Sequence, residues 1–416
     1  MLMNPLIFWW IRGTYLTIII VRINQMRCMI MSEQSSFVDW HATIYENIDQ
    51  LFEGDVHLKR VNSLANAVLG VITGTSLAVA VIGQSLAQAR GLCTKHALKQ
   101  VDRLLSNEKF VVWDYFAYWV INLLGDRKEI VVAMDWTDFD ADGQTTLVLS
   151  IVTSHGRATP VLWLSVWKDE LKGMRNSFED ACLVRLSKVL PAGVKVTILA
   201  DRGFGDHKLF KFLTELGFQF IIRFRGNIRV TAADGVTKAA AEWVGKDGRS
   251  RKLRDATITG TDCPIGAVVC VHAKGMKEAW CLAISNPDIK PKDAIDNYSK
   301  RWTIEPSFRD TKDLQFGMGL SNVRVSTPER RDRLLFLNAL AIHLLTILGA
   351  AGESIGLDRM LKSNTSKHRT HSLFRQGCML YDLMPKMPEA RFGPLMRRFF
   401  ELLQQCRVCS EVFSIV

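Results

Sequence analysis

The run EIVVAMDW (129–136) opens a segment in which strand patterns alternate with helix patterns. Short apolar runs typical of strands occur at 129–136, 145–154, 161–167, 195–201 and 218–224, and helical patterns occupy about 175–188 and 207–217. Continuous apolar runs such as VVAM and VTILA need cover on both faces of a sheet. The segment therefore predicts an α/β fold with buried central strands.

Two aspartates stand where strands of this segment are expected to end. Asp135 follows EIVVAM, and Asp201 follows KVTILA. In an open α/β sheet, ligands and reactive groups collect beyond the carboxyl ends of the strands. An aspartate in such a place is also an ordinary turn former or helix N-cap. Either residue alone is therefore ambiguous, and only a third group makes the pattern specific.

That third group lies in YSKRWTIEPSFRDTK (298–312). At about 100° per residue, a helix would bring Tyr298, Arg301, Glu305, Arg309 and Lys312 onto one face. On this reading, Trp302, Ile304 and Phe308 form a separate burial face. Mixed charges at such spacing are also typical of a solvated helix surface. Three carboxylates on separate elements, with cations beside the third, instead indicate a Mg²⁺ or Mn²⁺ site that acts on phosphodiesters.

The series AMDWTDFD, ILADRGFGD and YSKRWTIEPSFRDTK resembles the DDE transposases of bacterial insertion sequences. The resemblance is to the group with a Y-x2-R-x3-E-x6-K signature, which Tyr298, Arg301, Glu305 and Lys312 match at every position. It covers nearly the whole chain from about residue 31. It implies an RNase H-like catalytic core that is interrupted by a β-rich insertion, with a helical DNA-binding region in front.

The resemblance also implies a mechanism. Asp135, Asp201 and Glu305 would bind two Mg²⁺ (or Mn²⁺) ions for DNA cleavage and strand transfer. Tyr298, Arg301 and Lys312, with the neighbouring Arg309, would hold phosphates of double-stranded DNA. Two transposon ends must be held together, which implies a homodimer on DNA. Trp280 is either a core aromatic or, as in relatives that form a DNA hairpin, a platform for a flipped base.

The composition supports a nucleic-acid partner. The 416 residues are 48% hydrophobic, which is enough for a large core, and carry a formal charge of +11. An anionic membrane surface is the competing polyanion. Nine scattered cysteines predict a reducing, cytoplasmic setting, and Cys406 and Cys409 form an isolated C-x-x-C without zinc-site spacing.

The start of the chain divides into two parts. Residues 1–30 have the composition of an upstream extension of the reading frame and make neither a good signal peptide nor a clean membrane span. Residues 31–125 read as a helical DNA-binding region, in which one helix places Lys95, Lys99 and Arg103 on one side. A solvated basic face is the alternative.

An uncharged stretch, 63–89, is a formal candidate for a membrane span. Its many polar residues fit better as two soluble helices that separate at TGTS, with Thr75 or Ser76 as N-cap. We therefore expect no membrane association.

The rest of the chain is divided around the insertion. The catalytic core is expected at 126–223 and 281–350, the β-rich insertion at 224–280, and a helical C-terminal region at 351–416. Asp234–Gly235 and Asp247–Gly248 mark expected hairpins. Between residues 223 and 254, nine basic residues stand against three acids, which suits contacts with phosphates.

Three other classes of protein remain open from the sequence. A tyrosine recombinase would also combine a tyrosine with arginines, but it would stay active in EDTA. A non-catalytic DNA-binding protein or an inactive transposase remnant would be indifferent to the loss of Glu305. A membrane-associated protein would separate with membranes on fractionation.

Overall fold

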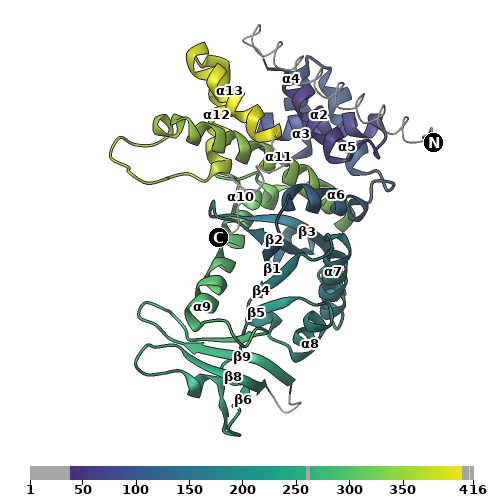
Figure 1. Ribbon diagram of the computed structural model, residues 1–416. Helices are drawn as coiled ribbons and strands as arrows, with labels where there is room; N and C mark the ends of the chain where they lie inside the picture. Colours follow the sequence, from purple (N-terminus) through teal and green to yellow (C-terminus); the bar gives the residue numbers. More distant parts are fainter. Residues whose placement is uncertain (1–37, 259–262, 405–411, 413–416) are drawn as a thin grey trace, which may run out of the picture.

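The computed structural model describes residues 38–258, 263–404 and 412, so the expected extension at 1–30 and the C-x-x-C lie outside the described residues. One ten-stranded sheet runs through the molecule, with helices from both ends of the chain gathered at one of its ends (Figure 1). The strands are β1 (Glu129–Phe139), β2 (Gln144–Val152), β3 (Ala158–Trp167), β4 (Lys195–Ala200), β5 (Gln219–Phe224), β6 (Arg229–Thr231), β7 (Thr237–Ala239), β8 (Arg251–Ile258), β9 (Cys263–Val271) and β10 (Trp280–Ile284). The fold is mixed α/β.

The first five strands confirm the strand predictions, and they lie in the order β3-β2-β1-β4-β5. Strands β1, β4 and β5 are parallel, while β2 is antiparallel to β1. Helices α7 (Arg175–Val189) and α8 (His207–Glu215) connect the parallel strands, as their patterns predicted. Strand β1 continues past its expected end to Phe139, so Asp135 lies within the strand and pairs with Val148 of β2.

The insertion does not form a separate sheet. Strand β10 pairs antiparallel with β5, and β9, β8, β6 and β7 follow in that order. The Asp234–Gly235 turn joins the paired strands β6 and β7, as expected. The hairpin expected at Asp247 is wrong, because that turn precedes β8, which pairs with β9 and β6 but not with β7.

The N-terminal helices are α2 (Trp40–Leu51), α3 (Leu58–Gly74), α4 (Val79–Arg90), α5 (Thr94–Leu105) and α6 (Val112–Leu124). Helices α3 and α4 separate at the predicted break and are bent by 98°. The predicted N-cap is wrong. Thr75 adopts a left-handed conformation at the C-cap of α3, and Ala78 is the N-cap of α4, where its amide donates to Oγ of Ser76.

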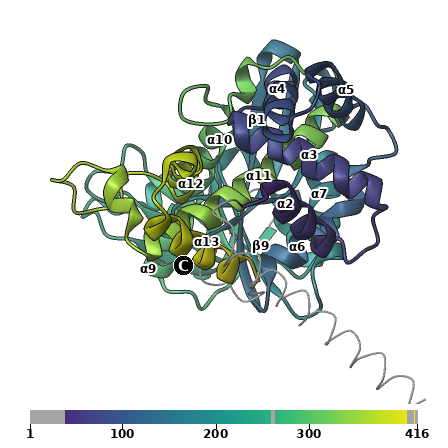
Figure 2. The same cartoon turned by 90° about the horizontal axis from the view of Figure 1, so that it is seen from above.

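The C-terminal half is built on the long helix α11 (Pro328–Ser354), followed by α12 (Leu373–Leu383) and α13 (Glu389–Gln404). Viewed from above, α12 and α13 lie to one side of α11 and the N-terminal helices to the other (Figure 2). Within the described ranges, α11 is the one single helix long and apolar enough to cross a membrane, and 83% of its apolar window is buried inside the protein.

Two glycines let α11 and α12 approach each other closely. A Cβ added to Gly377 would lie 1.8 Å from the carbonyl oxygen of Leu345, and one added to Gly349 would lie 1.9 Å from that of Leu373. Each helix therefore presents a glycine to the backbone of the other, where no larger side chain fits.

Asp332 fixes α11 against the sheet. Its Oδ1 accepts a hydrogen bond from the backbone amide of Ser165 on β3 at 3.0 Å, and its backbone carbonyl accepts one from Nε1 of Trp163 at 3.2 Å. Burial raises the pKa of Asp332 to about 8, with Glu329 raising it further, against the lowering effects of the Ser165 hydrogen bonds and Arg331. The carboxyl is therefore protonated in the folded protein at pH values where the unfolded chain has lost the proton.

We expect Asp332→Asn to flatten the decline in stability toward alkaline pH. Because the folded pKa lies above the unfolded value of about 3.9, stability from this group is complete below pH 4 and is lost as the pH rises toward 8. The parent should lose about 1.4 kcal/mol per pH unit relative to the variant across this window. Urea unfolding of both proteins at several pH values measures the difference, and parallel pH profiles would contradict the assignment.

Candidate active site

Asp135 in β1 and Asp201 just after β4 occupy neighbouring positions. The parallel pairing of β1 with β4 runs to Met134 and Ala200, so the two aspartates are the next residue of each chain segment. Oδ1 of Asp135 accepts from the amide of Trp136 at 2.9 Å. Asp201 caps the short 3-10 helix η3 (Arg202–Phe204), where its Oδ1 accepts from the amide of Gly203 at 2.8 Å. Local hydrogen bonds thus orient both carboxylates at the same sheet edge.

Glu305 joins this pair through Arg301. Nη1 of Arg301 lies 3.4 Å from Oδ2 of Asp135, and Nη2 lies 3.5 Å from Oε1 of Glu305. The Arg301 side chain is only 8% exposed, and its Nε is buried without a hydrogen-bond partner among the described residues. The guanidinium therefore spans the gap between the first and the third acid at ion-pair distances too long for strong hydrogen bonds.

The charges around Asp135 raise its proton affinity. Burial raises the pKa of Asp135 to about 6, and the negative charges of Asp201 and Glu305 add to the effect, while Arg301 opposes it. A buried carboxylate that two other acids repel is stabilised when a cation binds among them.

The donor set fits a hard divalent ion, because all three groups are carboxylates. Among the described residues, however, no three His, Cys, Asp or Glu side chains converge closely enough to hold a metal ion together.

The helix expected over 298–312 is broken into three pieces: α9 (Pro291–Ser299), the 3-10 turn η5 (Lys300–Thr303) and α10 (Ile304–Lys312). Because the 3-10 turn is wound more tightly than an α-helix, the polar residues expected on one helix face do not share a single face. Tyr298 and Arg301 are buried, whereas Glu305 and Arg309 are exposed. The assignment of Trp302 to the burial face is wrong, because 51% of this residue is exposed and its ring faces the Arg301 guanidinium at 5.1 Å.

Two further predicted residues contact the segments that carry Asp135 and Arg301. Nζ of Lys312 donates to Oγ1 of Thr137 at 3.1 Å and to the carbonyl of Asp138 at 2.7 Å, so it is tied to β1 just beyond Asp135. Trp280 begins β10, is half-buried, and meets Tyr298 edge-on with ring centroids 4.9 Å apart. The contact with the buried Tyr298 links the end of the insertion to the segment that carries Arg301.

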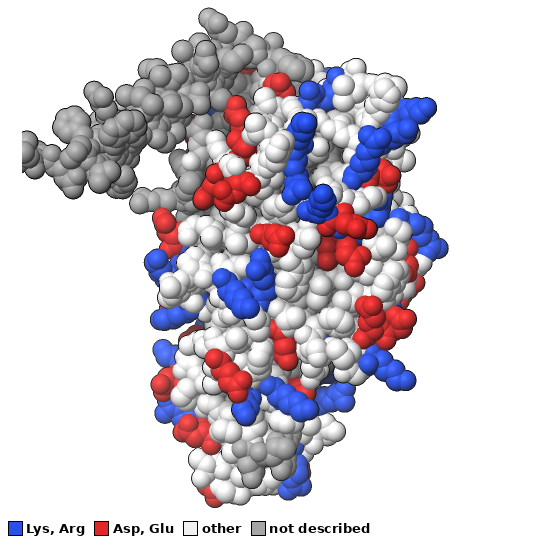
Figure 3. All heavy atoms as spheres, turned by 90° about the vertical axis from the view of Figure 1, so that its right-hand side faces the viewer, with Lys and Arg blue, Asp and Glu red and all other residues white. Residues whose placement is uncertain are grey.

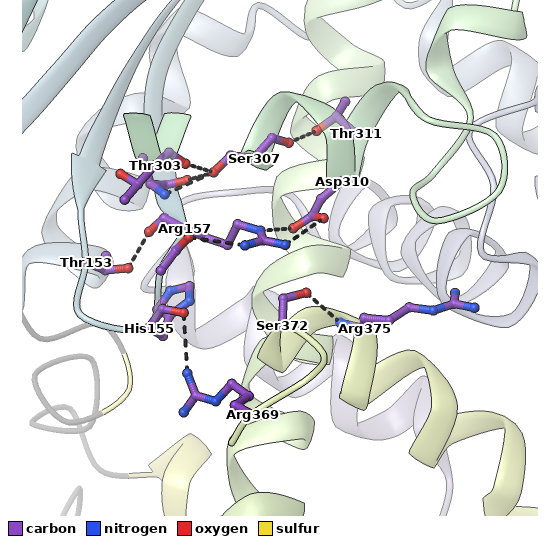
Figure 4. A network of polar contacts seen from close by, with 12 residues as sticks. Thr153, His155, Arg157, Thr303, Ser307, Asp310, Thr311, Arg369, Ser372 and Arg375 are labelled. Carbon is purple, nitrogen blue, oxygen red and sulfur yellow. Dashed lines mark hydrogen bonds and ion pairs between the residues drawn. The ribbon is translucent and has the colours of Figure 1, made fainter. Parts of the chain in front are cut away.

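Helix α10 is also anchored to the start of β3 through Ser307 and Asp310 (Figure 4). Nε of Arg157 donates to Oδ2 of Asp310 at 2.7 Å. Oγ of Ser307 accepts from the amide of Ala158 at 3.0 Å and donates to the carbonyl of the same residue at 2.7 Å. These contacts hold the helix that carries Glu305 in a fixed place relative to the sheet.

We expect Asp310→Ala to destabilise the protein by about 1–3 kcal/mol, because it leaves the half-buried Arg157 guanidinium without this acceptor. Glu129→Ala is the matched control: it removes an acid from the exposed Lys195–Glu129 pair, in which both side chains are about 70% exposed, and should cost at most about 1 kcal/mol. Urea unfolding compares the two. Equal losses would show that the Arg157 contact does not anchor α10.

The other predicted DNA-contacting residues lie away from this edge. Lys95, Lys99 and Arg103 share the exposed face of α5, opposite its buried residues. In the insertion, some of the basic residues are held by the protein itself: Nζ of Lys252 donates to the carbonyls of Pro287 and Ile289, and Arg254 pairs with Asp288. Others remain exposed, including Arg225, Arg229, Lys246, Arg249 and Arg251.

The sequence did not single out one group that borders the carboxylates. Arg175, at the start of α7, lies against the rings of Trp136 and Phe204, and its Nε donates to Glu179 at 3.0 Å. The only local sequence signal that could have pointed to Arg175 is its spacing of four residues from Glu179, and this spacing is common on any helix.

A mixed α/β fold thus places Asp135 and Asp201 at neighbouring positions of its central sheet, and Arg301 pairs with both Asp135 and Glu305. The family model of the transposase DDE domain matches residues 126–344, which include all three acids and slightly more than half of the chain. The chain therefore belongs to the transposase DDE domain family. Transposases of this family act on DNA and generally use divalent metal ions. No curated protein matches the chain.

Proposed function

We propose that this transposase binds the terminal repeats of its own insertion sequence, cleaves the DNA there and transfers the cut strand to a target. The main supporting observation is that Asp135 in β1 and Asp201 just after β4 hold neighbouring positions, and Arg301 joins Asp135 to Glu305. The sheet order and the positions of these two aspartates support an RNase H-like core. The match of Tyr298, Arg301, Glu305 and Lys312 to the Y-x2-R-x3-E-x6-K signature supports placement in that group.

We propose that Asp135, Asp201 and Glu305 hold two Mg²⁺ or Mn²⁺ ions. Bound there, the ions would activate the attacking hydroxyl and stabilise the departing oxygen. The residues of the chain prepare this site: the amides of Trp136 and Gly203 orient Asp135 and Asp201, and Arg301 pairs with Asp135 and Glu305. Arg301 lies between two of the acids, so bound cations would compete with the guanidinium for the same oxygens.

Cations around the site would hold the DNA. Arg309 is exposed on α10 beside Glu305, and Lys312 lies on the same helix, so both can reach phosphates near the scissile bond. The buried Tyr298 and Arg301 would shape the site from below. Trp280, at the end of the insertion, is placed against Tyr298, and we propose that it stacks on a base if the reaction passes through a hairpin.

The remaining regions would position the DNA. We propose that helices within 31–125 bind the terminal repeats, with the exposed Lys95, Lys99 and Arg103 contacting phosphates. The exposed cations of the insertion, 224–280, would extend the contact. The core would comprise 126–223 and 281–350, the active assembly would be a homodimer on DNA in the cytoplasm, and residues 1–30 would be dispensable.

Incubation of the purified protein with its own flanking terminal DNA tests the proposal. With Mg²⁺ we expect cleavage at the ends, and with EDTA binding without cleavage. Cleavage that persists in EDTA would favour a recombinase that needs no metal. Binding without cleavage under any metal condition would identify a DNA-binding protein or an inactive transposase.

A further inference from the structure

We propose that Arg175 grips a phosphate of the DNA strand on the α7 side of the carboxylates, opposite the side occupied by α10. This inference rests on the proposed function and extends it to a residue outside the DDE and Y-R-E-K patterns.

The Arg175 guanidinium is held between two aromatic rings. Its Cζ lies 5.7 Å from the ring centroid of Trp136 and 5.3 Å from that of Phe204. Trp136 directly follows Asp135, and Phe204 lies in the 3-10 turn that Asp201 caps. The arginine is therefore packed against the residue that follows Asp135 and against the turn that Asp201 caps.

Glu179 fixes the orientation of this arginine. The Glu179 side chain is only 6% exposed, and its Oε1 accepts from Nε of Arg175 at 3.0 Å and from Nε1 of Trp136 at 2.8 Å. One buried carboxylate thus links α7 to β1. Because Nε is engaged and the head is stacked, the guanidinium loses little further freedom on binding a ligand.

The two Nη groups of Arg175 have no protein acceptor among the described residues, and the side chain is 44% exposed. Gly203 borders both Arg175 and Asp201: a Cβ built on this glycine would lie 3.0 Å from Oδ1 of Asp201 and 3.8 Å from Nη2 of Arg175. The free edge of the guanidinium and the Asp201 carboxylate therefore border the same backbone position.

A cavity of about 460 Å³ continues away from this point between α7 and α8. Arg175, Asn176, Glu179, Asp180 and Lys208 are among its lining residues, and Lys208 is exposed. A planar, pre-oriented guanidinium with two free Nη groups suits bidentate binding of a phosphate. Lys208 adds a second positive charge to the lining, which Asp180 partly offsets.

A DNA strand accounts for these features better than a free anion, because the guanidinium is packed against Trp136 and Phe204, which closely follow two of the proposed catalytic acids in the chain. On the molecular face shown in Figure 3, Lys and Arg side chains are interspersed with Asp and Glu rather than gathered in one patch. On such a face, binding of a strand depends on individual well-placed cations.

The test measures DNA binding in EDTA, so it does not depend on catalysis. The probe is a fluorescent duplex of the terminal DNA that flanks the coding sequence, titrated with Arg175→Gln and with the parent between about 50 and 200 mM salt. Loss of one phosphate contact should make the slope of log K against log salt about 0.9 less negative. The affinity at low salt should fall about tenfold.

Three variants sharpen the result. Lys188→Gln removes an exposed cation from the other end of α7 and should leave the slope unchanged. Arg175→Lys keeps a positive charge and should restore the slope while affinity stays below that of the parent, because a lysine cannot bind bidentately. Glu179→Gln keeps an Oε1 acceptor for Arg175 and the positive charge of the arginine, so it should leave the slope unchanged.

The outcomes separate this inference from the proposed function. If the parent binds and cleaves the DNA while folded Arg175→Gln keeps the parental slope, Arg175 is a packing residue and the inference is wrong. An equal change with Lys188→Gln would also overturn it, because the effect would then be one of net charge. A parent that does not bind the duplex at all would contradict both proposals.

Discussion

Glu305→Ala, Asp135→Ala and Asp201→Ala should each abolish DNA cleavage while leaving binding to end DNA largely intact. Each carboxylate is expected to hold metal ions that stabilise the transition state by several kcal/mol, so the loss of one should slow cleavage by about 1000-fold or more. Removing an acid near DNA phosphates does not remove any phosphate contact. Affinity in EDTA should therefore be equal to that of the parent or slightly higher.

Glu329→Ala provides the matched control for Glu305→Ala. Both glutamates are exposed and lie in the first turn of a helix, Glu305 in α10 and Glu329 in α11, but only Glu305 pairs with Arg301. Cleavage of labelled end DNA should be lost in the first variant and retained in the second. Retained cleavage in Glu305→Ala, or a loss of DNA binding in all three acid variants, would contradict the assignment.

Gly377→Ala should destabilise the protein by about 3 kcal/mol or more, since the new methyl group would meet the Leu345 carbonyl oxygen. That oxygen belongs to the backbone of α11, so a side-chain rotation cannot relieve the clash. Helices α11 and α12 must move apart, which opens the packed interface between them.

Gly393→Ala makes the same chemical change on α13 and should change stability much less. There the nearest atom to a new Cβ, apart from the two chain neighbours, is Oε1 of Glu389 at 3.7 Å, an ordinary contact. The helix propensity of alanine favours the change, while the ring of the following Pro394 opposes a Cβ at this position. Thermal and urea unfolding should therefore place Gly377→Ala far below the parent and Gly393→Ala close to it. Similar shifts in both would show that the α11–α12 contact is looser than the structure indicates.

Strands β1 to β5 and the candidate acids could be predicted because their sequence patterns are local. Apolar runs identify β1 to β5, and Asp135 and Asp201 follow two of those runs, so their neighbouring positions could be predicted from the sequence. The fixed spacing from Tyr298 to Lys312 identified Glu305 in the same way.

Features that depend on contacts between distant segments could not be predicted from the sequence. The 3-10 turn at 300–303 buries Arg301 and exposes Trp302, and no periodicity rule anticipates a change of helix type within one short stretch. The role proposed for Arg175 depends on its contacts with Trp136 in β1 and Phe204 after β4, which the sequence does not show. The Asp247 turn failed as a hairpin because the partners of β8 are set by tertiary pairing rather than by the turn sequence.

The segment expected to form the insertion continues the central sheet, and its strand β9 pairs with the edge of β10. Without the strands before it, β10 would present an open row of amide and carbonyl groups on a strand whose residues Cys281 to Ile284 are buried. Such an edge is a template for pairing with another chain. The natural sheet instead ends at β7, a three-residue strand too short to recruit a neighbour. A shortened chain that lacks the insertion would therefore tend to self-associate through the exposed edge of β10, whether or not DNA is present.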